Sequence, residues 1–251
     1  MLAAPGLPAP TLPREVIEAR RREMLALGMI EYENCRRSGL YYLENYVWTY
    51  DEHEREEPAK PLLHGKPLID RITLQPMREL DGSEDDYLRY IALAWLQEKL
   101  LLIPKSRQLR LSHLMVNLHG WLCQFYPGQK VAIQSKVFED ADALLERRWQ
   151  SMQLEREKYP HIPWPEAKRK VGFIHWANGS LMMAIKQGGD KVRSYTFSAI
   201  LSDEMAFQEE AEEAYVAAIP TIEGGDAKYT GVSTANPGFF QTLVFDKAGA
   251  R

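Results

Sequence analysis

Apolar residues change their spacing several times along the chain, from the period of a helix to the unbroken runs of a buried strand. Residues 84–97 have the helical period, with Leu88, Ile91 and Trp95 on one face. The apolar residues that follow, 100–103, form a short unbroken run. Further runs of this kind are 131–133, 197–201 and one that ends at Val232. Such runs are typical of strands that are covered on both faces, as in a parallel sheet.

The alternation of these patterns predicts an α/β fold with a central, mostly parallel sheet flanked by helices. We expect one antiparallel hairpin in it, because residues 171–176 and 181–185 flank Asn178 and Gly179, a pair that favours tight turns. The chain begins with residues rich in Ala and Pro, and a helical pattern follows them. The expected organisation is a disordered lead-in at 1–13, an N-terminal helical region and loop at 14–83, and the α/β core at 84–251.

Composition restricts the function more than the fold. The 251 residues are 45% hydrophobic and 26% charged and carry a net charge of −4, so any contact with nucleic acid must be local. Cys35 and Cys123 lie far apart without partners at metal-ligand spacing, so we expect neither a disulfide framework nor a zinc site. No stretch approaches the about 20 apolar residues of a membrane-spanning helix, and no membrane contact is expected.

A polar loop follows the run at 100–103 and precedes a helical pattern that begins near Ser112. A helix N-terminus presents free N–H groups and a partial positive charge, which suit a phosphate. Lys105 adds a full charge, and the hydroxyl of Ser112 could ligate magnesium. The spacing leaves open an ordinary strand-to-helix turn with solvated basic residues, because the usual glycines of a phosphate loop are missing.

Two other segments follow strands that should end at the same edge of the sheet. Asp203 and Glu204 come after one apolar run, and Ser233 and Thr234 come after another. Because ligands bind outside the carboxyl ends of parallel strands, these side chains should meet the loop at Lys105. Asp203 could hold magnesium there, and Glu204 could activate a water molecule. The alternatives are an acidic helix start and a plain strand-exit turn.

The order of these motifs resembles the large subunit of tailed-phage terminases over roughly residues 88–240. The sequence Ile-Pro-Lys-Ser-Arg-Gln at 103–108 resembles the family's deviant Walker A loop, in which lysine stands at the beginning. The sequence Ile-Leu-Ser-Asp-Glu-Met-Ala-Phe at 200–207 resembles its Walker B motif, and Ser-Thr-Ala-Asn at 233–236 resembles its coupling motif. The resemblance implies a P-loop ATPase of the ASCE, RecA-like type. We expect only the N-terminal ATPase domain, because nothing here resembles the family's nuclease.

Carried onto this chain, the resemblance implies a role for each matching residue. Ser112 and Asp203 would hold Mg²⁺, Glu204 would be the catalytic base, and Ser233 and Thr234 would couple hydrolysis to movement. The implied phosphate cradle consists of Lys105, Ser106, Arg107, Gln108, Leu109, Arg110, Leu111 and Ser112.

Three further residues carry expectations of their own. Arg193 precedes the Walker B strand, where related motors place an arginine that reaches a neighbouring subunit's site; the alternative is a surface arginine in a loop. Arg110 stands where relatives usually have glycine, so its backbone must avoid positive φ or carry strain. Gln75 is a candidate for an adenine contact.

The resemblance also implies a function and partners. The chain would hydrolyse ATP with Mg²⁺ to move double-stranded DNA into a capsid in the host cytoplasm. It would act in a homo-oligomeric ring that meets a portal protein and a small terminase subunit. Two alternatives are another P-loop translocase or helicase-like ATPase, and a nucleotide-binding scaffold module that does not hydrolyse ATP. Asp203 and Glu204 favour hydrolysis, whereas Arg110 favours the scaffold.

Overall fold

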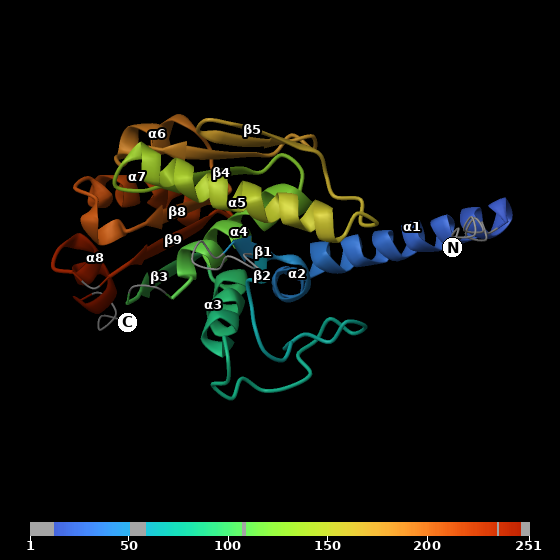
Figure 1. Ribbon diagram of the computed structural model, residues 1–251. Helices are drawn as coiled ribbons and strands as arrows, with labels where there is room; N and C mark the ends of the chain where they lie inside the picture. The colour runs from blue at the N-terminus through green and yellow to red at the C-terminus, as the bar shows by residue number, and fades with distance from the viewer. Residues whose placement is uncertain (1–12, 51–58, 107–108, 235, 247–251) are drawn as a thin grey trace, which may run out of the picture.

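The central sheet contains seven strands of the described chain, in the order β3-β9-β8-β4-β7-β6-β5 (Figure 1). The structure is a computed structural model that describes residues 13–50, 59–106, 109–234 and 236–246. The strands are β3 (Leu100–Pro104), β4 (Lys130–Gln134), β5 (Ala167–Lys170), β6 (Phe173–Trp176), β7 (Leu181–Ile185), β8 (Ala199–Asp203) and β9 (Lys228–Ser233). The five neighbouring strands β3, β9, β8, β4 and β7 are parallel. β6 pairs antiparallel with β7, and β5 pairs antiparallel with β6. The predicted mostly parallel sheet is confirmed.

Alternate residues of the inner strands are buried in two different hydrophobic clusters. Val131 and Ile133 of β4 belong to one cluster, whereas Ala132 between them belongs to the other. A strand covered on both faces requires this division, because successive side chains point to opposite faces. The first cluster includes residues of α2 (Gly39–Tyr46), α3 (Asp86–Gln97), α4 (Leu111–Phe125) and α5 (Phe138–Lys158). The second includes residues of α6 (Gly189–Ser194), η1 (Met205–Phe207), α7 (Ala211–Glu223), α8 (Phe239–Gln241) and η2 (Thr242–Asp246).

Several strands differ from what the sequence predicts. β8 starts two residues later than the apolar run and continues through Ser202 and Asp203, so the first predicted acid is the last residue of the strand. The predicted hairpin of β6 and β7 is confirmed, and Gly179 in its turn has φ +84°. β5 extends this hairpin, although the sequence did not predict it. Exposed Lys168 and Lys170 alternate along β5 with partly buried residues, so it has no apolar pattern that would mark it as a strand.

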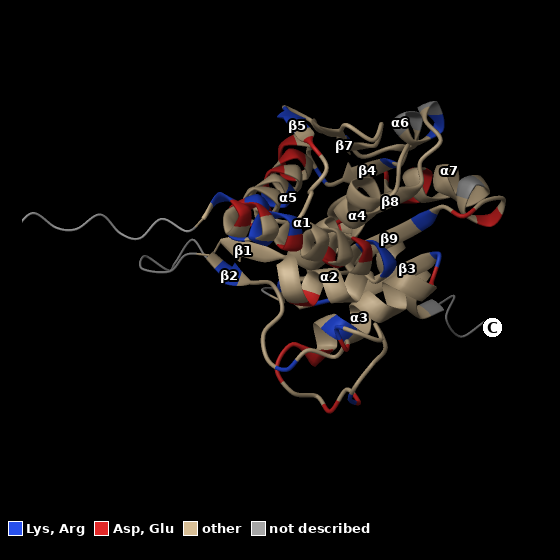
Figure 2. Cartoon of the chain, turned by 90° about the vertical axis from the view of Figure 1, so that its right-hand side faces the viewer, with Lys and Arg blue, Asp and Glu red and all other residues tan. Residues whose placement is uncertain are grey.

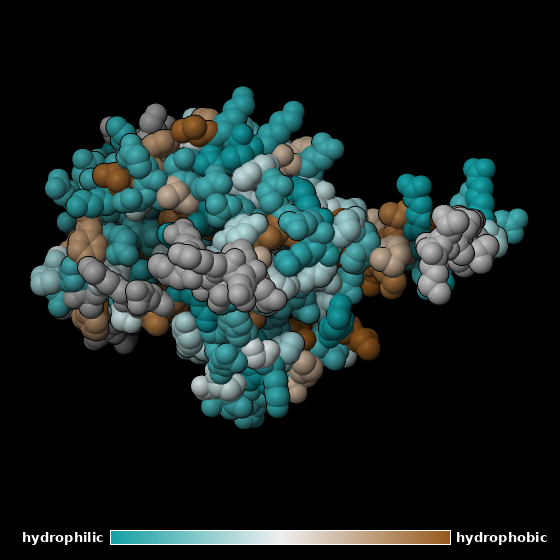
Figure 3. All heavy atoms as spheres, in the orientation of Figure 1, coloured by the Kyte–Doolittle hydropathy of each residue, from teal (hydrophilic) through white to brown (hydrophobic). Residues whose placement is uncertain are grey.

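The N-terminal helices pack on the same core. α1 (Arg14–Arg37) extends beyond the body, and hydrophobic side chains lie on its surface there (Figures 1 and 3). Where α1 reaches the body, a Cβ at Gly28 would lie 1.9 Å from the carbonyl oxygen of His161, so glycine permits this close approach. A separate antiparallel ribbon pairs β1 (Trp48–Tyr50) with β2 (Ala59–Pro61). Of the helices in the described ranges, α1 included, none has the length and apolar composition needed to span a bilayer.

A buried ionic cluster joins the N-terminal region to the core. The side chains of Arg148 and Glu155 on α5 are 0% and 1% exposed, and the two charged groups are 2.8 Å apart. The hydroxyl of Tyr42 on α2 donates to the same carboxylate, and the amide of Gln124 on α4 donates to it at 3.0 Å. The cluster therefore fixes three helices relative to one another, because each buried charge needs its partners.

Neutralising Glu155 should destabilise the protein strongly. Glu155→Gln leaves the buried charge of Arg148 without a counter-ion, and we expect the free energy of unfolding to fall by about 3 kcal/mol. Urea denaturation at neutral pH measures this. The control is Glu157→Gln at an exposed position of the same helix, which should change stability by less than about 0.5 kcal/mol. Equal effects of the two substitutions would contradict the role given to the ionic cluster.

Candidate active site

Five of the predicted site residues lie together at the carboxyl edge of the sheet. Lys105 follows β3, Asp203 ends β8, Ser233 ends β9, and Ser112 is in the first turn of α4. Glu204 follows Asp203 directly. β9 pairs with β3 on one side and with β8 on the other, so the ends of these parallel strands are neighbours. Parallel pairing therefore collects residues that are up to 128 positions apart in the sequence, from Lys105 to Ser233.

Lys105 is held by two contacts across this edge. Its backbone N–H donates to the carbonyl of Ser233 at 2.8 Å, which continues the pairing of β3 with β9. Its Nζ lies 3.0 Å from Oε1 of Glu204. The lysine side chain is 10% exposed and the glutamate side chain 38% exposed, so Glu204 is the more accessible partner of the ion pair. A phosphate group that approached the lysine would compete with Glu204 for it.

Ser112 and Asp203 form the inner part of the site. The hydroxyl of Ser112 lies 3.2 and 3.1 Å from the two carboxylate oxygens of Asp203. Burial raises the pKa of Asp203, opposed by the charge of Lys105 and the hydrogen bond from Ser112, while the charge of Glu204 raises it further. A hydroxyl and a carboxylate are the hard oxygen ligands that Mg²⁺ prefers. Across the described ranges, no three His, Cys, Asp or Glu side chains form a potential metal site by themselves.

The turn after β8 has an unusual backbone. Glu204 has φ +51° and ψ +41°, a left-handed conformation that is strained for a residue with a side chain. The hydroxyl of Ser233 accepts a hydrogen bond from the N–H of Ala206 at 3.0 Å and so fixes this turn to the end of β9. The hydroxyl oxygen of Thr234 is buried and has no hydrogen-bond partner among the described residues, although buried polar atoms normally have one.

The predicted cradle is only partly described. Ser106, Leu109, Arg110, Leu111 and Ser112 are described, and Leu111 is the first residue of α4. Arg107 and Gln108 lie outside the described residues.

The backbone of Arg110 was expected either to avoid positive φ or to carry strain. It carries strain, because its φ is +54°. Its guanidinium donates to the carbonyl of Leu62 at 2.9 Å and pairs with the carboxylate of Asp85. No sequence motif marks Asp85 as a partner of this arginine.

Two predicted residues lie in other parts of the structure. Arg193 belongs to the short helix α6 and not to a loop, and α6 follows β7, which is four strands away from β3 in the sheet. Its guanidinium lies 3.1 Å from the carboxylate of Glu213 on α7, with both side chains about half exposed at 53% and 49%. Gln75 is exposed in a tight turn, where its carbonyl accepts from the N–H of Asp70 at 2.9 Å.

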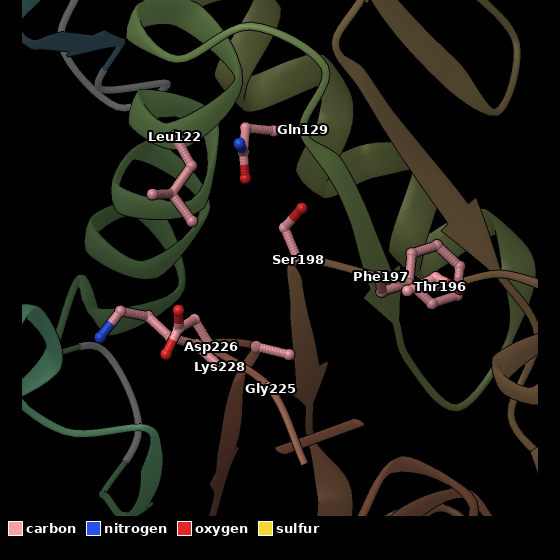
Figure 4. Close-up of a pocket in the computed structure, with 9 residues that line it drawn as sticks. Leu122, Gln129, Thr196, Phe197, Ser198, Gly225, Asp226 and Lys228 are labelled. Atoms are coloured by element: carbon pink, nitrogen blue, oxygen red, sulfur yellow. The ribbon is translucent and has the colours of Figure 1, made fainter. Parts of the chain in front are cut away.

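Two cavities of the described structure lie at the opposite, amino edge of the sheet. One of about 290 Å³ lies among Gln129, Ser198 and Lys228, next to the starts of β4, β8 and β9 (Figure 4). The other, of about 510 Å³, lies between Lys99 and Tyr215. The predicted site residues lie at the carboxyl edge, where ligands of open α/β sheets bind, and not at these cavities.

No protein-family model matches the sequence, and no curated protein matches it. Among solved structures, the bacteriophage HK97 large terminase is similar, with a TM-score of 0.54 and 14% identity. The Thermus phage P74-26 large terminase ATPase domain has a TM-score of 0.47 and 17% identity, over 60% of this chain and 66% of that chain. The large terminase of a thermophilic bacteriophage, in complex with ADP, has a TM-score of 0.46 and 13% identity, over 65% of this chain and 42% of that chain.

The similarity to the HK97 protein covers 86% of this chain but only 41% of the HK97 chain. The chain thus spans less than half of that protein. At 14% identity the similarity concerns the fold, and it agrees with the sheet and the helix layers described above. The protein therefore has the predicted RecA-like α/β fold, which it shares with a bacteriophage large terminase.

Proposed function

We propose that the protein is the ATPase part of a terminase large subunit, which hydrolyses ATP to move double-stranded DNA into a capsid. The observation that carries this proposal is the cluster of Lys105, Ser112, Asp203, Glu204 and Ser233 at the carboxyl edge of the sheet. The fold shared with the HK97 large terminase supports it. The order of the phosphate loop, the acidic pair and the hydroxyl pair along the chain, which resembles that of terminases, supports it as well.

The phosphates of ATP would bind between Lys105 and the N-terminus of α4. The lysine amine would leave Glu204 and pair with a phosphate, and free N–H groups of the first helical turn would donate to phosphate oxygens. Ser112 and Asp203 would supply two oxygen ligands for Mg²⁺, with phosphate and water as the others. Mg²⁺ in such a site neutralises charge on the phosphates.

Glu204 would act as the general base once Lys105 binds phosphate. Its carboxylate would accept a proton from a water molecule as the water oxygen attacks the γ-phosphorus. The bond from the γ-phosphorus to the bridging oxygen then breaks, which yields ADP and inorganic phosphate. The hydroxyl of Thr234, which has no hydrogen-bond partner among the described residues, would contact the γ-phosphate. The hydrogen bond from the N–H of Ala206 to the hydroxyl of Ser233 would transmit the departure of the γ-phosphate to the turn at η1.

The partners in this proposal come from the fold likeness and the motifs. They are double-stranded DNA, a portal protein, a small terminase subunit and further copies of this chain in a ring in the host cytoplasm. Figure 2 shows basic and acidic residues interspersed along the helices of that view, and the net charge is −4. The DNA contact is therefore proposed from the fold likeness and the motifs, without support from an extended basic surface.

The first test is ATP turnover with Mg²⁺ by the purified chain. Glu204→Gln should lower turnover by about 100-fold or more while nucleotide binding is retained, because it removes the base. Lys105→Ala should weaken nucleotide binding, because it removes the charge that meets the phosphates. The controls are Glu209→Gln and Lys168→Ala at exposed positions. If both site variants hydrolyse ATP like the parent chain, the site assignment is wrong. Binding without turnover in the parent chain would favour the scaffold alternative.

Asp203→Asn should increase stability at neutral pH and abolish turnover. Because burial raises the pKa of Asp203 in the folded protein, its carboxyl ionises more readily in the unfolded chain. The free energy of unfolding therefore falls as the pH rises above about 4, the ordinary pKa of Asp, and this loss is absent from the variant.

Urea denaturation at pH 7 and below pH 4 measures the effect on stability. The gain should be present at pH 7 and absent at the lower pH. Asp226→Asn, at a fully exposed position, is the matched control and should not show this pH-dependent gain. A variant less stable than the parent chain at pH 7 would refute the burial argument.

In the proposed ring, Arg193 would reach the active site of a neighbouring subunit, and Arg193→Ala tests this role. The side chain is 53% exposed, so a neighbouring subunit can reach it. Nucleotide binding should be retained, and turnover should fall by about 10³-fold only under conditions in which subunits assemble. Turnover measured across a range of protein concentrations separates the assembled subunits from the isolated subunits. Arg147→Ala on α5 is the control, and a loss of nucleotide binding in Arg193→Ala would rule out the proposed role.

A further inference from the structure

The buried carboxylate of Asp85 links Arg110, the residue immediately before α4, to the N-terminal region. Asp85 stands immediately before α3 and is 5% exposed. One of its oxygens accepts from the N–H of His64 at 2.7 Å, and the other pairs with the guanidinium of Arg110. The same guanidinium donates to the carbonyl of Leu62 at 2.9 Å. Arg110 is thus bonded directly to Leu62 of the N-terminal region and, through Asp85, to His64 of the same region.

A second contact from α3 reaches the preceding loop residue. The hydroxyl of Tyr87 donates to the carbonyl of Leu109 at 3.1 Å. The start of α3 therefore holds both residues that come immediately before α4. These contacts involve a carboxylate and a phenol from different residues, so they are independent observations of the same attachment.

The backbone of Arg110 explains why such an attachment is needed. Its φ of +54° is in the left-handed region, which glycine adopts freely and other residues avoid. Without support, the loop would relax towards conformations with negative φ and would turn the start of α4 away from its present direction. The ion pair with Asp85 and the bond to Leu62 offset this strain.

The segment to which Asp85 is attached is itself held by buried contacts. Arg89 is 1% exposed; it donates to the carbonyl of His64 at 2.9 Å and to the carboxylate of Glu44 at 2.7 Å. Glu44 in turn accepts from the N–H of Leu68 at 2.7 Å. His64 is therefore held at its carbonyl by Arg89 and at its N–H by Asp85. Two ion pairs, Arg110 with Asp85 and Arg89 with Glu44, are thus connected through hydrogen bonds to the backbone of His64, and they lead from the loop to α2.

We propose that Asp85 is a positioning residue for nucleotide binding. By holding Arg110, it keeps the last turn of the loop in the shape that presents the N-terminus of α4 and the hydroxyl of Ser112 to the phosphates. Asp85 acts here only through Arg110. The inference rests on the proposed function, because it concerns the same nucleotide site, and it makes the N-terminal region a determinant of nucleotide affinity.

The test compares Asp85→Asn in two backgrounds. In the parent chain, the substitution should weaken ATP binding about tenfold, as expected if the competent loop shape is populated ten times less. Turnover at saturating ATP should change much less, because the catalytic residues are unaltered. In an Arg110→Gly background, Asp85→Asn should no longer change ATP affinity, because glycine adopts positive φ without a partner. Titration with ATP and steady-state kinetics measure these effects.

Asp86→Asn is the matched control. Asp86 is the next residue, and its side chain is 2% exposed. It pairs with Arg78 at 2.5 Å and lies 3.5 Å from Arg89, but among the described residues it makes no hydrogen bond or ion pair with Arg110. Its loss should therefore lower thermal stability without releasing Arg110. ATP affinity should nevertheless stay at the parent value. Equal weakening of ATP binding by Asp85→Asn and Asp86→Asn would overturn the proposal, as would a full effect of Asp85→Asn in the Arg110→Gly background.

Hydrogen exchange in the nucleotide-free protein separates this inference from the proposed function. Asp85→Asn should speed exchange of the backbone amides at 109–114, and Arg110→Gly should remove the difference. Unchanged exchange would overturn the positioning role. A parent chain that shows this exchange pattern but binds no ATP would refute the proposed function and with it the role of Asp85 in nucleotide affinity, while the attachment of the loop would stand.

Discussion

The parallel pairing of β9 with both β3 and β8 is the constraint on which the site depends. Its register sets Pro104 opposite Ser233 and Asp203 opposite Val232, so the three strands end at the same level. The hydrogen bond from the N–H of Lys105 to the carbonyl of Ser233 extends this pairing by one residue. β9 lies between β3, which precedes the lysine, and β8, which carries the carboxylates. Without β9 in this place, β3 and β8 would still end at the same edge of the sheet, but no shared strand would hold their ends close together.

Gathering these groups at one edge carries a free-energy cost that remains visible in the structure. Burial raises the pKa of Asp203, and Glu204 and Arg110 both have left-handed backbone conformations. Strain and buried charge of this kind persist only where the surroundings hold them, and they concentrate at functional sites. Here the hydroxyl of Ser233 holds the turn after Glu204, and Asp85 holds Arg110.

The N-terminal region supports the site through the same physical means. Its buried residues belong to the hydrophobic cluster that also contains Val131 and Ile133 of the sheet. Two buried ion pairs restrict how the helices of this region are oriented. One pair is Arg148 with Glu155, and the other is Arg89 with Glu44. Apolar packing alone would tolerate small rotations of the helices, whereas each buried charge requires its partners in one arrangement.

The sequence by itself determined the local features of this protein. Strands β3, β4, β8 and β9, the hairpin and the order of the motifs follow from apolar spacing and turn residues. The meeting of Lys105 with Asp203 and Glu204 follows from the rule for parallel sheets. Only the tertiary structure decided that Arg110 is strained and finds its partner in Asp85, and that β5 joins the sheet. Such features depend on which distant segments pack together, and no local preference of the chain records that choice.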